Sequence, residues 1–208
     1  MKDKQQSLQT ELLGNIATRE RLMQASTELF TRKGYAATSV REIVAAAGVS
    51  KPVLYYYFKN KEGIFQEIVR FGIEKVDNLI LEVAAMNGSV LPKIRYLFER
   101  TIWMMQEDLP VMRLLYAAQN GGGRELPPVN LQDISERFDD AVLVLVKEGI
   151  RRGEFIEDDP EIMRWVLVGT ISLTMEMMLF RPELGSGRDS LIRMVDLILR
   201  GFAASTSR

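Results

Sequence analysis

Ten residues, Val49–Phe58, hold a dense group of side chains suited to binding another molecule. They read VSKPVLYYYF, in which a lysine and a proline precede three tyrosines and a phenylalanine. Successive residues of a helix point about 100° apart, so three consecutive tyrosines cannot share one face. We therefore expect at least one ring to pack inward. The others can present their hydroxyl groups to phosphate oxygens.

Groups that would support catalysis are scarce in the remainder of the chain. The 208 residues include no cysteine and no histidine. This composition excludes a disulfide framework, a thiolate nucleophile and Ser–His or Cys–His catalysis, and it argues against a zinc site. The acidic run at 157–159 is typical of a helix start. We expect no catalytic residues, no metal and no cofactor.

Charge is distributed unevenly along the sequence. Residues 1–63 carry ten Lys/Arg and six Asp/Glu, although the whole chain has a net charge of −1. A basic N-terminal third on an acidic body is typical of a nucleic-acid-binding head attached to a separate domain. Uneven scatter of solvated charges is the alternative interpretation.

Apolar residues recur at spacings of three and four, which predicts an all-α protein of about nine helices. The sequence indicates a polar, partly disordered extension over 1–17, a DNA-binding domain over 18–63 and a larger domain over 64–208. Helices are expected near 18–33, 64–83 and 92–107, followed by a shorter one through 118. After the loop at 120–128, a long helix is expected to run to about 152, and two more are expected near 160–180 and 190–204. The loop NGGGRELPP, at 120–128, has the strongest breaker composition in the chain.

Two short helices joined by AAGVS form a predicted helix-turn-helix. Ser39 can cap the first, with Glu42 three residues later completing a capping box. Gly48 supplies the positive φ of a tight turn. Ser50 is expected to cap the second helix, and Pro52 lies in its first turn, where a missing N–H costs little. Leu54 and Phe58 are assigned to the core.

The stretch TSVREIVAAAGVSKPVLYYYFKNKEGIF resembles the DNA-binding segment of the TetR family of transcriptional regulators. The resemblance runs from about Thr18 to Phe65 and includes Phe30, Gly34 and Lys61. It departs from the family pattern at Tyr57, where histidine is frequent, and at Pro52, where a small residue is frequent. It covers about a quarter of the chain.

The resemblance implies that the second short helix lies in the major groove. There Lys51 would donate to guanine, and Pro52 and Val53 would touch a thymine methyl group. The DNA backbone would be bound by Ser39, Ser50, Tyr55, Tyr56, Tyr57 and Lys61. Ser39 and Ser50 are helix caps first, and Tyr55 serves equally well as a core ring.

The resemblance also implies a helical domain that dimerises and binds a small effector. The helices at 160–180 and 190–204 are apolar on more than one face, which favours a homodimer through the last two helices. Both could instead be central helices of a monomer. The expected interface residues are Gly169, Ser172, Met175, Leu179, Leu191, Val195, Ile198 and Phe202.

Methionines and aromatic residues of the larger domain can line an adaptable apolar pocket, although such residues are more often core. Glu176, in an apolar helix, could attract a cationic ligand, pair with an arginine or face solvent. We expect a mostly apolar effector. The candidate lining residues are Trp103, Met104, Tyr116, Gln119, Trp165, Thr170, Thr174, Glu176 and Met178.

Together these features predict a cytoplasmic, ligand-responsive repressor that binds a partly palindromic operator as a dimer. No membrane span is expected, because Glu176 interrupts the longest apolar stretch, Val166–Phe180. One alternative is an all-helical enzyme or small-molecule carrier whose helix-turn-helix is architectural. Another is a non-specific architectural DNA binder without an effector.

Overall fold

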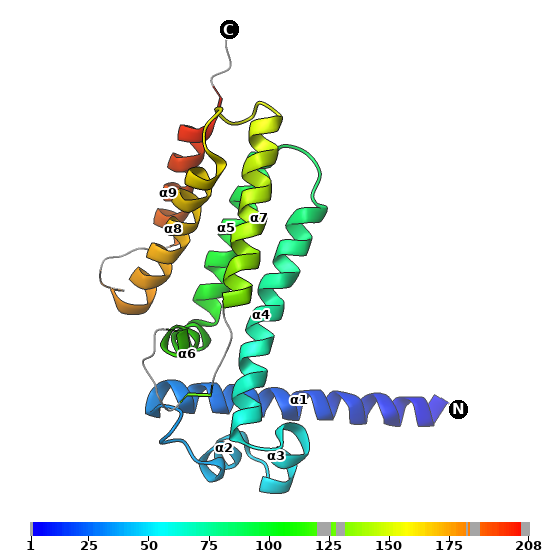
Figure 1. Ribbon diagram of the computed structural model, residues 1–208. Helices are drawn as coiled ribbons and strands as arrows, with labels where there is room; N and C mark the ends of the chain where they lie inside the picture. The colour runs from blue at the N-terminus through cyan, green and yellow to red at the C-terminus, as the bar shows by residue number, and fades with distance from the viewer. Residues whose placement is uncertain (1, 120–125, 128–131, 182, 184–187, 205–208) are drawn as a thin grey trace. The chain divides into compact units, whose positions relative to one another are not determined.

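The computed structural model describes residues 2–119, 126–127, 132–181, 183 and 188–204. Within these residues the chain forms nine helices and no strand, apart from one isolated bridge between Phe155 and Ala203 (Figure 1). The predicted all-α class is confirmed. The helices are α1 (Lys2–Lys33), α2 (Val40–Ala47), α3 (Lys51–Phe58), α4 (Lys61–Ala85), α5 (Val90–Glu107), α6 (Leu109–Gln119), α7 (Gln132–Arg151), α8 (Pro160–Phe180) and α9 (Arg188–Phe202).

Backbone contacts divide the chain into two compact units. The first comprises Met1–Gly72 and Pro110–Val129, and the second comprises Ile73–Leu109 and Asn130–Arg208. The division falls inside α4 and places α6 with the N-terminal helices. The first unit therefore takes in more of the chain than the segment 18–63 suggested by the sequence. Most of the loop 120–128 lies outside the described residues.

The first helix begins earlier than the apolar stripe from residue 18 indicated. Residues 2–17, expected as a partly disordered extension, have a helical backbone continuous with the rest of α1. Its later turns bury Leu22, Leu29 and Phe30 against the rest of the first unit. Phe30, Tyr35 and Phe65 form a ring cluster with centroid separations of 5.1–6.3 Å, which fixes α1 beside the start of α4.

Four helices of the second unit, α5, α7, α8 and α9, pack directly against one another. Helix α5 buries a broad apolar face that includes Ile94, Leu97 and Phe98. At the end of α7, a Cβ added to Gly149 would lie 2.3 Å from Phe155 Cδ2, so glycine is needed for that ring to pack there.

Helix α8 is apolar on nearly all sides but is not enclosed by the subunit. Of the described helices, it is the one with the length and mean hydropathy, 1.4, to cross a membrane, and 33% of that window is buried. A single helix of this kind is weak support for a membrane span, because helices of soluble proteins meet the same test. Its exposed apolar side chains are compatible with a face that another protein surface covers.

Candidate nucleic-acid interface

Helix α2 begins with the capping box that the sequence predicted. Ser39 is extended, its Oγ accepts a hydrogen bond from Glu42 N at 3.3 Å, and Glu42 Oε2 accepts one from Ser39 N at 2.9 Å. Lys33, at the end of α1, pairs with the same carboxylate. The hydrogen bond from Lys33, followed by those from Ser39, lowers the pKa of Glu42 to about 2. Glu42 thus connects α1 to α2 through a charge.

The turn after α2 depends on Gly48, whose φ of 66° lies in the left-handed region that glycine tolerates. Its N–H donates to the last carbonyls of α2, and Val49 N donates to Val44 O at 3.0 Å. Ser50 takes the N-cap position of α3 with extended backbone, but its side chain makes no capping hydrogen bond. The expected side-chain cap at Ser50 is therefore wrong. The first turn of α3 contains Pro52 instead.

Helix α3 separates an inner face from an outer one. Leu54 and Phe58 are buried, as predicted. Tyr56 is 77% exposed and Tyr55 48% exposed. The side chains of Lys51 and Pro52 are exposed and that of Val53 is half-buried. The residues assigned to base contacts therefore lie together in the first turn of a helix whose outer face is open.

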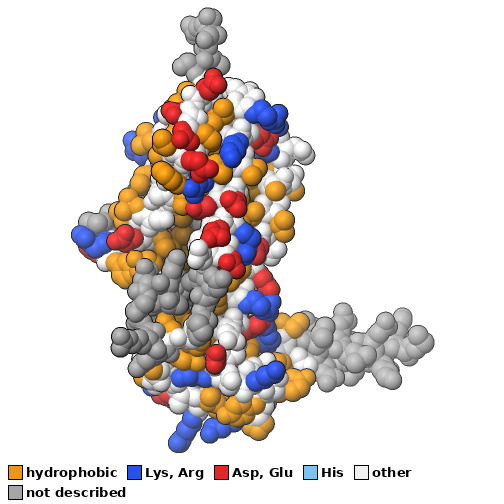
Figure 2. Space-filling model, in the orientation of Figure 1, with side chains coloured by type: hydrophobic (Ala, Val, Ile, Leu, Met, Phe, Trp, Pro, Cys, Tyr) orange, Lys and Arg blue, Asp and Glu red, His pale blue; other side chains and the backbone are white. Residues whose placement is uncertain are grey.

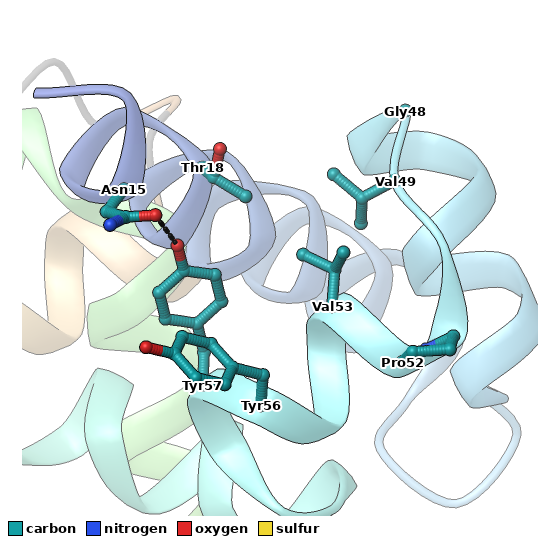
Figure 3. A pocket seen from close by; sticks show the side chains of 8 residues that line it. All are labelled: Asn15, Thr18, Gly48, Val49, Pro52, Val53, Tyr56 and Tyr57. Carbon is teal, nitrogen blue, oxygen red and sulfur yellow. Dashed lines mark hydrogen bonds between the residues drawn. The ribbon is translucent and has the colours of Figure 1, made fainter. Parts of the chain in front are cut away.

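Tyr57 is the ring that packs inward. Its hydroxyl donates a hydrogen bond to Asn15 Oδ1 on α1 at 2.8 Å, and its ring meets that of Tyr56 edge-on at 5.0 Å (Figure 3). The Tyr57 hydroxyl, predicted to donate to a DNA phosphate, thus donates its proton to Asn15 in this structure. Tyr57 therefore acts here by fixing α3 to α1, and Tyr56 holds the exposed hydroxyl.

Between α1 and α3 the surface forms an open hollow of about 700 Å³ (Figure 3). Tyrosine rings, small apolar side chains and two polar side chains of α1 line it. The hollow is open to solvent rather than enclosed. The lining residues are Asn15, Thr18, Gly48, Val49, Pro52, Val53, Tyr56 and Tyr57.

Lys61, at the start of α4, makes hydrogen bonds within the chain. Its Nζ donates to Tyr35 O at 2.8 Å and to Thr38 O at 2.9 Å, and it lies 4.1 Å from the centre of the Tyr35 ring. The ammonium group therefore satisfies carbonyls of the α1–α2 connection. The phosphate contact expected of this side chain stays a prediction.

Other cations remain on the surface around α2 and α3. The side chains of Arg41, Lys51 and Lys59 are all exposed. Figure 2 shows Lys and Arg side chains beside hydrophobic ones at the α2–α3 end of the molecule. Exposed positive charge beside exposed tyrosine rings and hydroxyls is the combination that binds a phosphate backbone.

Sequence reasoning missed the part played by α1. Asn15 and Thr18 line the hollow, yet residues 1–17 were treated as a separate extension. Only the polar spacing of Asn15 and Thr18, one helical turn apart, could have indicated a shared face. Lys59 was also missed. It ends α3 with a φ of 61°, a backbone conformation that no local motif around it announced.

The candidate effector residues are dispersed. Thr170 and Thr174 are buried in the second unit, whereas Trp165, 62% exposed, and Glu176 face outward. The exposed pair does not line an interior pocket of the subunit. Trp103, Met104 and Met178 are half-buried in the second unit, and Tyr116 is half-buried in the first. The Gln119 side chain lies outside the described residues.

The predicted dimer residues divide in a similar way. Gly169 and Ser172 are exposed on α8, and Met175, Ile198 and Phe202 are half-buried. Leu179 and Val195 are 5% and 2% exposed, because they pack into the subunit's own core. A partner subunit cannot reach them in this conformation. The Leu191 side chain lies outside the described residues.

Comparison with known proteins identifies the N-terminal segment. Residues 22–68 match the family described as bacterial regulatory proteins, tetR family. Over 68 residues the chain is 35% identical to the HTH-type transcriptional regulator AcrR of Shigella flexneri, covering 33% of this chain and 32% of AcrR. The chain thus spans about a third of the length of that relative.

Two solved structures share the fold over most of the chain. A TetR-family regulator, PfmR of Thermus thermophilus, has a TM-score of 0.70 at 24% identity, covering 90% of this chain and 98% of PfmR. A regulator of the TetR/AcrR family from Thermobifida fusca has a TM-score of 0.64 at 27% identity, covering 91% of this chain and 98% of that regulator.

A helix-turn-helix with an open outer face is typical of DNA-binding proteins. Residues 22–68 match the TetR family of transcriptional regulators, and over most of its length the chain shares the fold of solved regulators of that family. The relatives with which it aligns are named as regulators of transcription and not as enzymes.

Proposed function

We propose that this protein is a ligand-responsive transcriptional repressor. It binds a partly palindromic operator as a homodimer and is released by a small, mostly apolar effector. It acts in the cytoplasm, where the DNA is. The observation that carries the DNA-binding part is the outer face of α3. Lys51 and Pro52 begin it and Tyr55 and Tyr56 continue it, all exposed, over a buried Leu54 and Phe58.

Each side chain of α3 then has a distinct task. Lys51 at the helix start donates to guanine O6 or N7, while Pro52 and Val53 contact a thymine methyl group. Tyr55 and Tyr56 donate to backbone phosphates, as does Ser50, whose hydroxyl makes no cap. Ser39 and Tyr57 position the two helices by hydrogen bonding to Glu42 and Asn15. Lys61 stabilises the α1–α2 connection.

Dimerisation supplies the second recognition helix, so that two half-sites about 34–36 Å apart are read together. Support comes from α8, where large apolar side chains stand in solvent at helical spacing, together with Leu197 of α9. Such a stripe is costly in a monomer and typical of a protein interface. On α8 these side chains are Ile162, Trp165, Val166, Leu173 and Phe180, with Gly169 and Ser172 among them.

Repression would be relieved by ligand binding in the second unit. An effector releases DNA only if it binds one conformation of the dimer more tightly than the other. The conformation with bound effector would hold the two recognition helices at a spacing that no longer matches the half-sites.

The test is selection of bound sequences from a random duplex library by the purified full-length protein at near-physiological salt. Enrichment of a partial palindrome is the expected result. A folded protein that enriches nothing, or one that binds all duplexes with a steep salt dependence, would contradict specific operator binding. A reporter gene placed behind the selected site then distinguishes repression from activation.

A further inference from the structure

Two polar atoms buried in the second unit have no hydrogen-bond partner among the described residues: Thr174 Oγ1 on α8 and Arg100 Nε on α5. The threonine needs no ligand. Thr101 and Thr170, also buried on these helices, donate to the carbonyl one turn back, and Thr174 can rotate to do the same. Arginine has donors only and stays charged, so Arg100 requires an acceptor from elsewhere.

Arg100 is also exceptional in its charge environment. The other partly or wholly buried cations of the second unit have carboxylate partners: Lys93 with Glu148, Lys75 with Asp108 and Arg164 with Asp139. No ion pair joins Arg100 to a described carboxylate. Its guanidinium lies 4.4 Å from the centre of the Trp103 ring, which orients it but does not neutralise it. Among the described cations of this unit that are at least half-buried, Arg100 is therefore the one without a carboxylate partner.

Arg100 lies among aromatic and apolar side chains of α5, with the Tyr96 hydroxyl and its acceptor Glu82 at one side. Tyr96, Arg100, Trp103 and Met104 share one flank of α5, and all four are half-buried. Tyr96 shows which way that flank faces, because its hydroxyl donates to Glu82 of α4 at 2.7 Å. Yet α4 does not approach α5 with the close backbone packing that joins α5 to α7, α8 and α9.

In the part of α4 that belongs to the second unit, three apolar side chains are not fully enclosed. Ile73, Val76 and Ile80 are half-buried, whereas the close-packed face of α5 is buried throughout. The flank therefore combines half-buried hydrophobic surface with a single guanidinium whose Nε lacks an acceptor.

From this combination we infer that the effector is an amphipathic monocarboxylate. Its carboxylate would be bound by Arg100, and its apolar body would lie between α4 and α5 against Trp103 and Met104. A guanidinium fork matches a carboxylate with two parallel hydrogen bonds. A single surplus charge suits a monoanion better than a phosphate dianion. The inference rests on the proposed effector response and specifies its ligand.

The test uses full-length protein and three carboxylate probes of different shape: octanoate, dodecanoate and naphthoate. Each is compared by isothermal titration calorimetry with the neutral alcohol of the same skeleton. We expect at least one carboxylate to bind about tenfold or more tightly than its alcohol, as a charge-assisted hydrogen bond provides. Binding should also change the fluorescence of wild type but not of Trp103→Phe.

The matched variants are Arg100→Gln and Arg151→Gln, which remove one positive charge each from the second unit. Arg151 is exposed in the last turn of α7. Arg100→Gln should lose the carboxylate preference, with alcohol binding unchanged, and Arg151→Gln should behave as wild type. Arg100→Lys keeps the charge but not the fork, and should retain part of the preference. It replaces Arg100→Gln if that variant does not fold.

Three results would overturn the inference: no binding of any probe, equal affinity for acid and alcohol, or the same loss in both glutamine variants. The DNA selection is independent of these. A protein that selects an operator but ignores carboxylates remains a regulator with a different effector. If the protein binds carboxylate through Arg100 but does not release DNA, the carboxylate site is supported and the proposed release by effector is refuted.

Discussion

Lys51 and Lys61 both stand at helix starts, but their ammonium groups have different environments. Lys51 is exposed at the first position of α3, whereas Lys61 is occupied by the carbonyls of Tyr35 and Thr38. A cation at a helix N-terminus interacts unfavourably with the helix dipole, so helix stability does not explain a lysine at position 51. At position 61, the hydrogen bonds to the two carbonyls do explain one.

Replacement of Lys51 tests the base contact. Lys51→Ala should weaken binding to the selected operator by about 1–3 kcal/mol and relax sequence preference at one position. Lys59→Ala, which removes an exposed charge from the other end of α3, should weaken binding to all duplexes alike. Fluorescence anisotropy with matched and mismatched duplexes measures both. Uniform losses from both substitutions would refute the assignment of Lys51.

The stability of the first unit should fall in acid because of Glu42. Its folded pKa of about 2 lies below the ordinary value of 4.5, so its contribution to stability is present above about pH 4.5. That contribution should disappear as the pH falls from about 4.5 to about 2. Thermal unfolding followed across this range should show a smaller acid dependence in Glu42→Gln. An identical pH profile in the two proteins would exclude the Lys33–Glu42–Ser39 contact.

At the level of helices, α3 and α4 are joined by only two residues, Lys59 and Asn60. Asn60 N donates to Phe58 O at 2.6 Å, and Asn60 Oδ1 accepts from Gly63 N at 2.7 Å. A Cβ on Gly63 would stand 2.1 Å from Phe58 O, which is a backbone atom. The end of the recognition helix and the start of α4 therefore cannot separate or rotate independently without a change here.

Gly63→Ala should destabilise the protein by about 1–3 kcal/mol, because the backbone must shift to admit the methyl group. Gly72→Ala is the matched control within the same helix. Its Cβ would meet Leu115 Cδ1 at 3.7 Å, an ordinary contact, and alanine favours a helix by about 0.5–1 kcal/mol. Chemical denaturation measures both. Equal stabilities of the two variants would show that the backbone between α3 and α4 shifts at little cost in free energy.

In the whole molecule, the proposed dimer brings two recognition helices together through the exposed face of α8. Leu173→Glu adds a charge to that face and should convert a dimer into monomers in sedimentation velocity, with loss of operator binding. Val144→Glu makes the same change at an exposed valine of α7 and should leave the dimer intact. Dimers that persist in Leu173→Glu would place the interface elsewhere.

Local features of the sequence were enough to predict the helices and the helix-turn-helix. Periodic apolar residues, the Ser39–Glu42 capping box and Gly48 act within one or two helical turns, so they can be read locally. The inward position of Leu54 and Phe58 followed from the same spacing. The resemblance of residues 18–65 to the TetR family rests on these local features.

The partner of each polar side chain depends instead on how the helices assemble. Tyr57 meets Asn15 and Lys61 meets Tyr35 only after α1, α3 and α4 assemble, because these contacts span long sequence separations. Leu179 and Val195 lie on helices that are apolar on more than one face, so the sequence did not show which face is buried. Packing within the subunit buries both residues. Arg100 looked like any surface arginine in the sequence. Its lack of an acceptor is a property of the folded second unit, where burial removes the water that would otherwise satisfy it.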